Sequence, residues 1–310
     1  MKANKIIISS LTTALMLGSL CSCVNLGDIY QDADEYTAGN IDISGTVEKL
    51  DIDWKAGSVT VSHHDKDTVS VTETCETELS EERQVHTWLD GNVLHIRYCK
   101  SGESFTLTNS EKKLEVKVPM NIKLTDIDMD GASCDAVFDD ISADTFNVDM
   151  ASGTAELKNC TANIFDLDSA SGGIILTQKG DSDKISADTA SGKVDITAEN
   201  VKELNTDSAS GTVKIDVQTS DKVDIDTASG DTEVHFANMP KEINFDAASG
   251  DITMYTPKNP DITIDFDTAS GDFNSDISFK MEDKKYISGT GENKMKADTA
   301  SGDLYIKEAE

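Results

Sequence analysis

Residues 201–230 read VKELNTDSASGTVKIDVQTSDKVDIDTASG, and this stretch decides the fold because it holds two copies of one unit. Each copy contains the string Asp-x-Ala-Ser-Gly, with Ser210 and Ser229 standing 19 residues apart. Hydrophobic and polar residues alternate on both sides of the string, as at Val213 and Ile215. Alternation with a period of two predicts a β-strand with one buried face. Each unit therefore predicts a strand, a tight Ser-Gly turn and a second strand.

The same unit recurs through most of the chain. Successive steps between the serines of Ala-Ser-Gly are 19 to 21 residues, until a final step of 31. An imperfect copy surrounds Ser133, and a further one spans Leu50 to Val61. Units of this length cannot bury a core alone and stack into solenoids. We therefore expect an all-β, single-stranded β-solenoid (β-helix) with coils of about 19–20 residues and Asp-x-Ala-Ser-Gly corners. The serines are Ser152, Ser171, Ser191, Ser210, Ser229, Ser249, Ser270 and Ser301.

The first residues predict export and lipidation. Residues 1–22 have a basic start and an apolar run, Ile6 to Leu20, which is typical of a signal peptide and short for a membrane span. Leu20-Cys21-Ser22-Cys23 resembles the bacterial lipobox, so we expect a covalent lipid on Cys23. Two or more acyl chains make a stable anchor. The predicted location is therefore extracytoplasmic, at the bacterial cell membrane.

Three segments follow the signal peptide in the predicted domain organisation. Residues 23–40 comprise the lipidated cysteine and a polar tether. The solenoid occupies residues 41–310. Within it we expect irregular N-terminal coils at 41–129 and regular repeats at 130–306. A binding site is expected where the repeat breaks, at 62–113 and 276–296.

The charge of the chain limits its partners. Aspartate and glutamate number 58 against 27 lysines and arginines, which gives a formal net charge of −31. Such a charge repels nucleic acids and anionic lipids. We therefore expect no nucleic-acid partner. The expected contacts are the membrane, through the lipid anchor, and a protein or glycan ligand of unknown identity.

Four cysteines remain for the folded part. Disulfides are permitted outside the cytoplasm. Cys75 and Cys99 each end an expected strand, so they are the candidate disulfide if these strands pair, and free thiols are the alternative. The other two cysteines are Cys134 and Cys160.

The aspartate before each corner has two interpretations. Its carboxylate can accept hydrogen bonds from turn amides, which is a structural role. Alternatively, stacked carboxylates bind Ca²⁺, although calcium requires six to eight oxygen ligands. We favour the structural role and expect no metal and no cofactor apart from the lipid. The candidates for the calcium alternative are Asp226, Asp231, Asp246, Asp251, Asp267 and Asp272.

Three features together resemble a known family. They are the string LDIDWKAGSVTV at 50–61, the step Val116-Lys117-Val118-Pro119 and the repeated Asp-x-Ala-Ser-Gly-Asp. Over residues 41–306 the chain resembles the "putative adhesin" family of bacterial surface proteins, a domain of unknown function. The resemblance implies a β-solenoid fold and a cell-envelope location. It brings no catalytic residues.

We therefore predict a non-enzymatic, surface-anchored lipoprotein that acts as an adhesin or interaction scaffold. The recurring serines have no paired histidine, which argues against a catalytic triad. One alternative is a carbohydrate-active β-helix enzyme, whose site would lie in 62–113, where the repeat is lost at length. Another alternative is a regulatory lipoprotein of the envelope-stress response.

Overall fold

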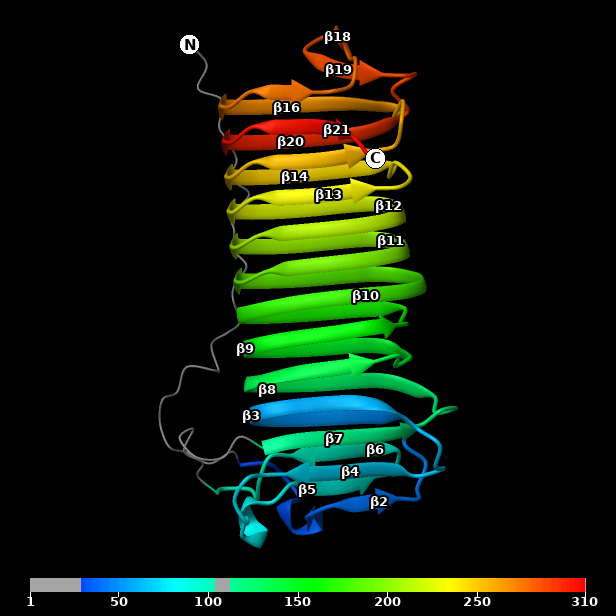
Figure 1. The fold of residues 1–310 in the computed structure, drawn as a ribbon, viewed down its shortest axis with the longest axis vertical. Coiled ribbons are helices and arrows are strands. Elements are labelled where there is room, and N and C mark those ends of the chain that lie inside the picture. Colours follow the sequence, from blue (N-terminus) through cyan, green and yellow to red (C-terminus); the bar gives the residue numbers. More distant parts are fainter. Residues whose placement is uncertain (1–28, 104–111, 310) are drawn as a thin grey trace.

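The computed structural model describes residues 29–103 and 112–309. The predicted signal peptide and Cys23 lie outside these described residues. Strands stack into one tall column (Figure 1). Helical structure in the described part is limited to two 3-10 turns, η1 (Ala33–Glu35) and η2 (Glu81–Arg83). The predicted all-β class is therefore confirmed.

The middle of the column is a regular parallel solenoid. Its strands pair in the register of the sequence repeat, so that Asp130 lies opposite Asp149 and Asp207 opposite Asp226. Because each copy repeats the same pattern, every coil presents the same positions to the coil above it. The solenoid predicted from the repeat is confirmed. The strands are β8 (Leu124–Asp139), β9 (Ala143–Cys160), β10 (Ile164–Ser191), β11 (Val194–Ser210) and β12 (Val213–Ser229).

The coils towards the C-terminal end consist of shorter strands. Strand pairing stops after Ser229 and resumes at Thr232, so the Gly230-Asp231 step separates the two halves of a coil. These strands are β13 (Thr232–Phe236), β14 (Glu242–Ser249), β15 (Ile252–Thr256), β16 (Ile262–Ser270), β17 (Phe273–Ser275), β20 (Asn293–Ser301) and β21 (Leu304–Glu308).

Glycine after the serine is required by the stacking of the coils. Gly230 has a φ of 134°, in a region that side chains disfavour. A Cβ atom at Gly230 would lie 1.7 Å from the carbonyl oxygen of Gly211 in the next coil. The glycines therefore form a column in which one backbone packs directly on another.

The interior is one continuous hydrophobic core. The alternating apolar side chains point inwards, and Leu204, Val223 and Ile243 are fully buried in successive coils. Phe146 and Phe165 stack with their ring centroids 5.3 Å apart. Since one unit buries too few side chains to offset its ordering entropy, neighbouring coils must complete this core.

The N-terminal end departs from chain order. The copy at 50–61 lies in β3 (Lys49–His64), which pairs with β8 on one side and with β6 (Val93–Arg97) and β7 (Lys112–Pro119) on the other. This copy is therefore a genuine coil, but it is not the end of the column. Short strands before β3 and from the described part of 62–113 cover the end through antiparallel pairs. The covering strands are β1 (Thr37–Ala38), β2 (Ile41–Ile43), β4 (Val69–Thr74) and β5 (His86–Asp90).

The C-terminal end also departs from chain order. Strand β20 pairs with β14 on one side and with β16 on the other. The last coil of the chain is thus inserted between two earlier ones, as the red strands of Figure 1 show. The extra residues of the 31-residue step form a hairpin of β18 (Lys280–Glu282) and β19 (Lys285–Ser288), which pairs with β16 and covers this end.

The structure contains no helix, within its described part, that is long and apolar enough to span a membrane.

Candidate functional site

The most regular polar feature is a column of aspartates, one from each coil, which we call the aspartate ladder. These residues precede the serine by three positions and meet in register on neighbouring parallel strands. Since parallel strands lie about 4.8 Å apart, the carboxylates follow one another at that spacing. In spatial order the members are Asp53, Asp130, Asp149, Asp168, Asp188, Asp207, Asp226, Asp246, Asp298 and Asp267, and Arg97 occupies the next position beyond Asp53.

Within the described residues, ion pairs between ladder aspartates and lysine occur only near the ends of the aspartate ladder. Arg97 lies opposite Asp53, and the Lys55 Nζ atom lies 2.5 Å from Asp53 Oδ1. At the other end Lys296 forms an ion pair with Asp298. Within the described ranges, the members from Asp130 to Asp246 form no salt bridge with lysine or arginine. The middle of the ladder therefore carries uncompensated carboxyl groups.

Burial and mutual repulsion raise the pKa values of these carboxyl groups. Burial is the larger cause for Asp168, followed by the charges of Asp188 and Asp149, and its pKa rises to about 7. By the same causes the pKa values of Asp130, Asp188 and Asp226 rise to about 6. Burial also raises the pKa values of Asp149, Asp207 and Asp246. The middle of the ladder is thus partly protonated near neutral pH.

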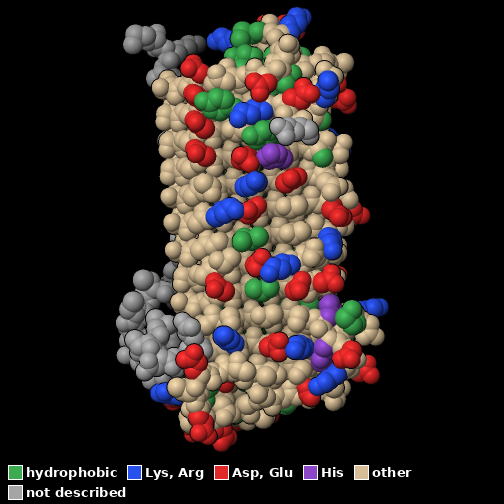
Figure 2. Space-filling model, viewed as in Figure 1, with side chains coloured by type: hydrophobic (Ala, Val, Ile, Leu, Met, Phe, Trp, Pro, Cys, Tyr) green, Lys and Arg blue, Asp and Glu red, His purple; other side chains and the backbone are tan. Residues whose placement is uncertain are grey.

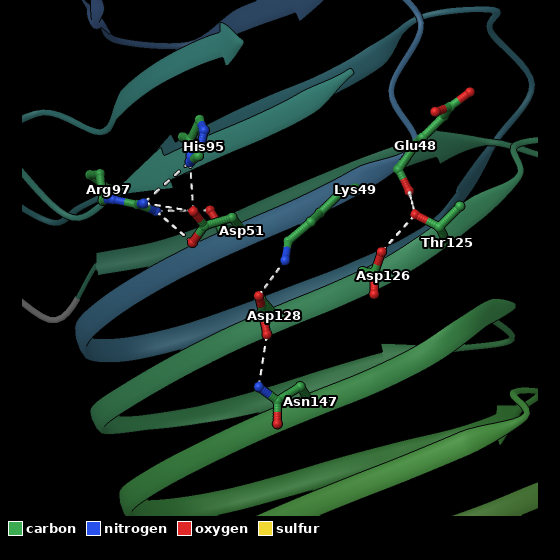
Figure 3. A network of polar contacts seen from close by, with 9 residues as sticks. All are labelled: Glu48, Lys49, Asp51, His95, Arg97, Thr125, Asp126, Asp128 and Asn147. Atoms are coloured by element: carbon green, nitrogen blue, oxygen red, sulfur yellow. Dashed lines mark hydrogen bonds and ion pairs between the residues drawn. The ribbon is translucent and has the colours of Figure 1, made fainter. Parts of the chain in front are cut away.

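A second polar column runs beside the ladder, two residues earlier in each coil. It includes Asp128, whose carboxylate accepts hydrogen bonds from Lys49 Nζ at 2.5 Å and from Asn147 Nδ2 at 2.8 Å (Figure 3). Further along, the two columns border a hollow of about 240 Å³. The hollow is lined by Ser186, Asp188, Glu203, Asn205, Thr206, Asp207, Asp224 and Asp226.

The N-terminal end of this face gathers polar and aromatic side chains. Asp51 on β3 accepts hydrogen bonds from Arg97 Nη1 at 2.9 Å and Nη2 at 2.8 Å, and His95 Nδ1 lies 2.6 Å from its Oδ2 atom (Figure 3). Trp88 on β5 stacks on His95, with ring centroids 5.4 Å apart. Tyr36 lies 5.5 Å from the Trp88 ring. We call these five residues the N-terminal cluster.

The N-terminal cluster is electrostatically satisfied. Burial would raise the pKa of Asp51, but the hydrogen bonds and charges of Arg97 and His95 outweigh it and lower that pKa. Burial likewise would lower the pKa of Arg97, but Asp51 raises it. A carboxylate held ionised by an arginine and by several hydrogen bonds is a poor general acid or base at neutral pH. The arrangement suits recognition through rings and fixed hydrogen-bonding groups.

The candidate disulfide between Cys75 and Cys99 is not formed. Cys75 has a free thiol, 3.7 Å from Thr77 Oγ1. The two strands that precede these cysteines do not pair with each other, because β4 pairs with β2 and β7, whereas β6 pairs with β3 and β5. Cys134 and Cys160 are buried thiols.

The calcium candidates divide into two columns. Asp226, Asp246 and Asp267 belong to the aspartate ladder. The others lie two residues after the serine. Of these, Asp231 Oδ1 accepts a hydrogen bond from Asp251 N–H at 3.0 Å, and Asp251 Oδ1 accepts one from Asp303 N–H at 2.9 Å. Asp272 N–H in turn donates to Asp303 Oδ1 at 2.8 Å. Among the described residues, no group of three or more histidine, cysteine, aspartate or glutamate side chains is arranged to hold a metal ion.

The turn-capping role was therefore assigned to the wrong aspartate. The side chain three residues before the serine lies on the sheet face, whereas the aspartate two residues after it reaches the turn amides of a neighbouring coil. Asp135 makes the same contact, accepting a hydrogen bond from Thr154 N–H at 2.8 Å. Only some copies of the repeat contain an aspartate two residues after the serine, and this was the sequence feature that could have indicated the contact.

The two breaks in the repeat contain packing features that the sequence pattern did not indicate. In the N-terminal break, Lys112 Nζ lies 2.5 Å from Glu73 Oε2, and their side chains are only 1% and 5% exposed. The ammonium group also lies 4.0 Å from the centroid of the Tyr98 ring. In the C-terminal break, Tyr286 of the hairpin stacks on Phe273 at 3.7 Å. Both contacts seal an end of the core.

The comparisons with known proteins agree with this architecture. A family model described as Toastrack DUF4097 matches residues 47–307. The chain belongs to the Toastrack DUF4097 family. The match confirms the family resemblance and the solenoid architecture. No curated protein matches the chain.

Solved structures are similar to this chain at low sequence identity. A "putative lipid binding protein" from Parabacteroides distasonis has a TM-score of 0.51 and 14% identity, covering 89% of this chain and 97% of that one. A "putative adhesin" from Bacteroides fragilis has a TM-score of 0.47 and 12% identity, covering 87% and 96%. The first likeness supports the fold alone.

Proposed function

We propose that this Toastrack protein is a lipid-anchored, non-enzymatic interaction scaffold on the outer side of a bacterial cell membrane. Its lipid would be attached to Cys23, and its ligand would be a protein or a glycan. The lipobox-like string supports the anchor, and the repeated coils support a scaffold, since they distribute the acidic side chains along the body and do not concentrate them at one reactive position.

The observation that carries the scaffold proposal is the composition of the N-terminal cluster. It lies where the repeat ends, and it combines Trp88 and Tyr36 with the polar groups of Asp51, His95 and Arg97. Aromatic rings and arginine are the groups most enriched at binding hot spots. By contrast, the face seen in Figure 2 carries interspersed acidic and basic side chains with few hydrophobic ones.

Binding assays with the lipid-free mature domain test this proposal. The domain is immobilised and challenged with intact bacterial and host cells and with an array of glycans. We expect saturable binding that falls at least about tenfold in a Trp88→Ala variant, because loss of a hot-spot ring costs 2 kcal/mol or more. Tyr255→Ala is the matched control. The Tyr255 ring also stacks on a histidine, His235, with ring centroids 4.1 Å apart, but this pair lies far from the N-terminal cluster.

Two outcomes would contradict the proposal. If the domain binds no cell surface or glycan, an interaction role fails. If it cleaves a glycan, and alanine substitutions in 62–113 abolish the cleavage, the protein is an enzyme. Equal loss of binding in the Trp88 and Tyr255 variants would move the site away from the N-terminal cluster.

A further inference from the structure

The aspartate ladder holds more negative charge than its surroundings neutralise. Its middle members are stacked coil upon coil. Asp149, Asp188, Asp207 and Asp226 are partly buried, whereas Asp130 and Asp168 are more exposed, so water screens their mutual repulsion only in part. Asp188 and Asp207 illustrate the closeness of the packing, because Asp207 N–H donates a hydrogen bond to Asp188 Oδ1 at 3.0 Å. A folded chain can relieve such repulsion only by binding cations or protons.

We propose that the aspartate ladder is a proton-binding device, in which neighbouring carboxyl groups share protons and thereby stabilise the solenoid in mildly acidic surroundings. This inference goes beyond the proposed scaffold function and does not depend on any ligand. It concerns how the folding stability of the solenoid depends on the external pH.

The charged groups that face the middle carboxylates of the ladder are mostly acidic, so protonation is the way to reduce the repulsion between these carboxylates. The carboxylates nearest to its middle, apart from the ladder itself, are Asp128, Asp166 and Asp224. The cations in range are Lys55 for Asp130, Lys184 for Asp188 and Lys296 for Asp246. After the larger effect of burial, the charged groups that act on Asp168 and Asp226 are other aspartates.

Two pairs of ladder residues show how protons would be shared. Asp168 and Asp149 lie opposite each other on neighbouring strands, so a protonated Asp168 can donate a hydrogen bond to Asp149, which raises the pKa of Asp168 after the larger effects of burial and neighbouring charge. Asp226 and Asp207 are placed in the same way. Such a bond requires a proton on one partner, and the pair therefore titrates as a unit.

A third polar column, four residues before the ladder in each coil, carries alternating charges and does not repeat this arrangement. Seven residues before the serine, successive coils carry Lys184, Glu203, Lys222 and Glu242, which pair in register. Lys222 Nζ lies 3.7 Å from Glu203 Oε1. Because alternating charges compensate one another, the pH response is confined to the aspartate column.

The direction of the response follows from the pKa shifts. The ladder pKa values lie above the ordinary value, at about 6 to 7 for Asp130, Asp168, Asp188 and Asp226, so the folded chain binds more protons than the unfolded one between about pH 4 and 7. Stability is therefore gained as the pH falls through this window. It is lost again as the pH rises above the folded-state pKa values.

Other titratable groups affect the stability outside this pH window, or their effect can be separated from that of the ladder by substitution. Asp51 and Asp261 have lowered pKa values, so their stabilisation is lost only in stronger acid, below the ordinary aspartate value. Substitution of ladder residues separates the ladder from the histidines, because it leaves every histidine in place.

Thermal unfolding of the mature protein, purified in detergent, tests the proposal at pH 7.5, 6.5 and 5.5. We expect the wild-type Tm to rise by several degrees from pH 7.5 to 5.5. Asp168→Asn should raise the Tm at pH 7.5 and flatten the rise, because the amide mimics the protonated carboxyl group. Asp216→Asn is the matched control, since Asp216 is exposed on the other half of its coil, and it should keep the wild-type slope.

Either of two results would overturn the proposal. One is a wild-type Tm that is constant or falls towards pH 5.5. The other is an Asp168→Asn variant with the wild-type slope. Should the variant fail to fold, calorimetry of the wild type at pH 6 in buffers of different ionisation enthalpy decides the matter. Proton release on unfolding supports the proposal, and the absence of release contradicts it.

Discussion

Arg97 holds the Asp51 carboxylate through two parallel hydrogen bonds, from Nη1 to Oδ1 at 2.9 Å and from Nη2 to Oδ2 at 2.8 Å. The two residues lie 46 positions apart, on strands that chain order alone would not place together. The pair joins the irregular N-terminal end to the first genuine coil. It thereby connects the proposed binding surface to the rigid body.

Replacement of Arg97 tests how much its two parallel hydrogen bonds to Asp51, the fork, contribute to the free energy of unfolding. Arg97→Met should destabilise the protein by about 1.5–3 kcal/mol, because it leaves a half-buried carboxylate without its main partner. Arg97→Lys keeps the charge but loses the fork and should recover part of that loss. Urea unfolding measures both. Equal stability of the Met variant and the wild type would show that the fork contributes nothing.

The buried pair of Lys112 and Glu73 makes a sharper prediction. Removing one partner leaves a buried charge uncompensated, so Lys112→Met should cost about 3–5 kcal/mol. The double variant Lys112→Met with Glu73→Leu should regain most of this loss, since apolar replacements of both partners avoid the desolvation cost. Denaturant unfolding of the two variants decides the point, and a double variant as unstable as the single one would refute it.

The glycine column predicts a difference between two glycines with positive φ. Gly230→Ala would drive Cβ into the Gly211 carbonyl and should cost about 3 kcal/mol or more. Gly91 has a φ of 57° but nothing within 4 Å of an added Cβ, so Gly91→Ala should cost only about 1 kcal/mol of backbone strain. Comparable losses of unfolding free energy in the two variants would show that the coils separate easily at the glycines.

The inserted last coil predicts an unusual effect of truncation. A chain that ends at residue 292 lacks β20 and β21, which pair with β16 and β17. Backbone amides of 262–275 should therefore exchange rapidly, whereas those of 194–229 stay protected. Removal of residues 309–310 alone is the control. Hydrogen exchange gives the readout, and protection retained at 262–275 would contradict the observed strand order.

Much of the body was predictable from the sequence because the repeat is explicit. The spacing of Asp207 and Asp226 specified coil length and register, and Leu50 to Val61 was recognisable as a further copy. The order of the coils at the ends was not predictable. All copies share one pattern, so the sequence is equally compatible with several neighbours for the strands of the last coil.

The site was predictable only in its location. The repeat break at 62–113 indicated where to look, and Trp88, His95 and Arg97 lie there. Their contacts with Asp51 depend on β6 lying beside β3, which no local pattern specifies. The same limitation explains the Cys75–Cys99 error, since strand ends that look equivalent in sequence belong to different pairs. Lys112 carried no signal, because a buried lysine resembles an exposed one in a sequence.

The most direct test of the account is the position of the protein in intact cells of its source. Cells labelled with a palmitate analogue are treated with a protease that cannot cross the membrane, and the protein is followed by immunoblot. The account predicts a labelled, membrane-bound protein that the protease digests, and a Cys23→Ala variant that loses the label. A protein that carries no lipid, or that stays protected until the cells are lysed, would contradict the account.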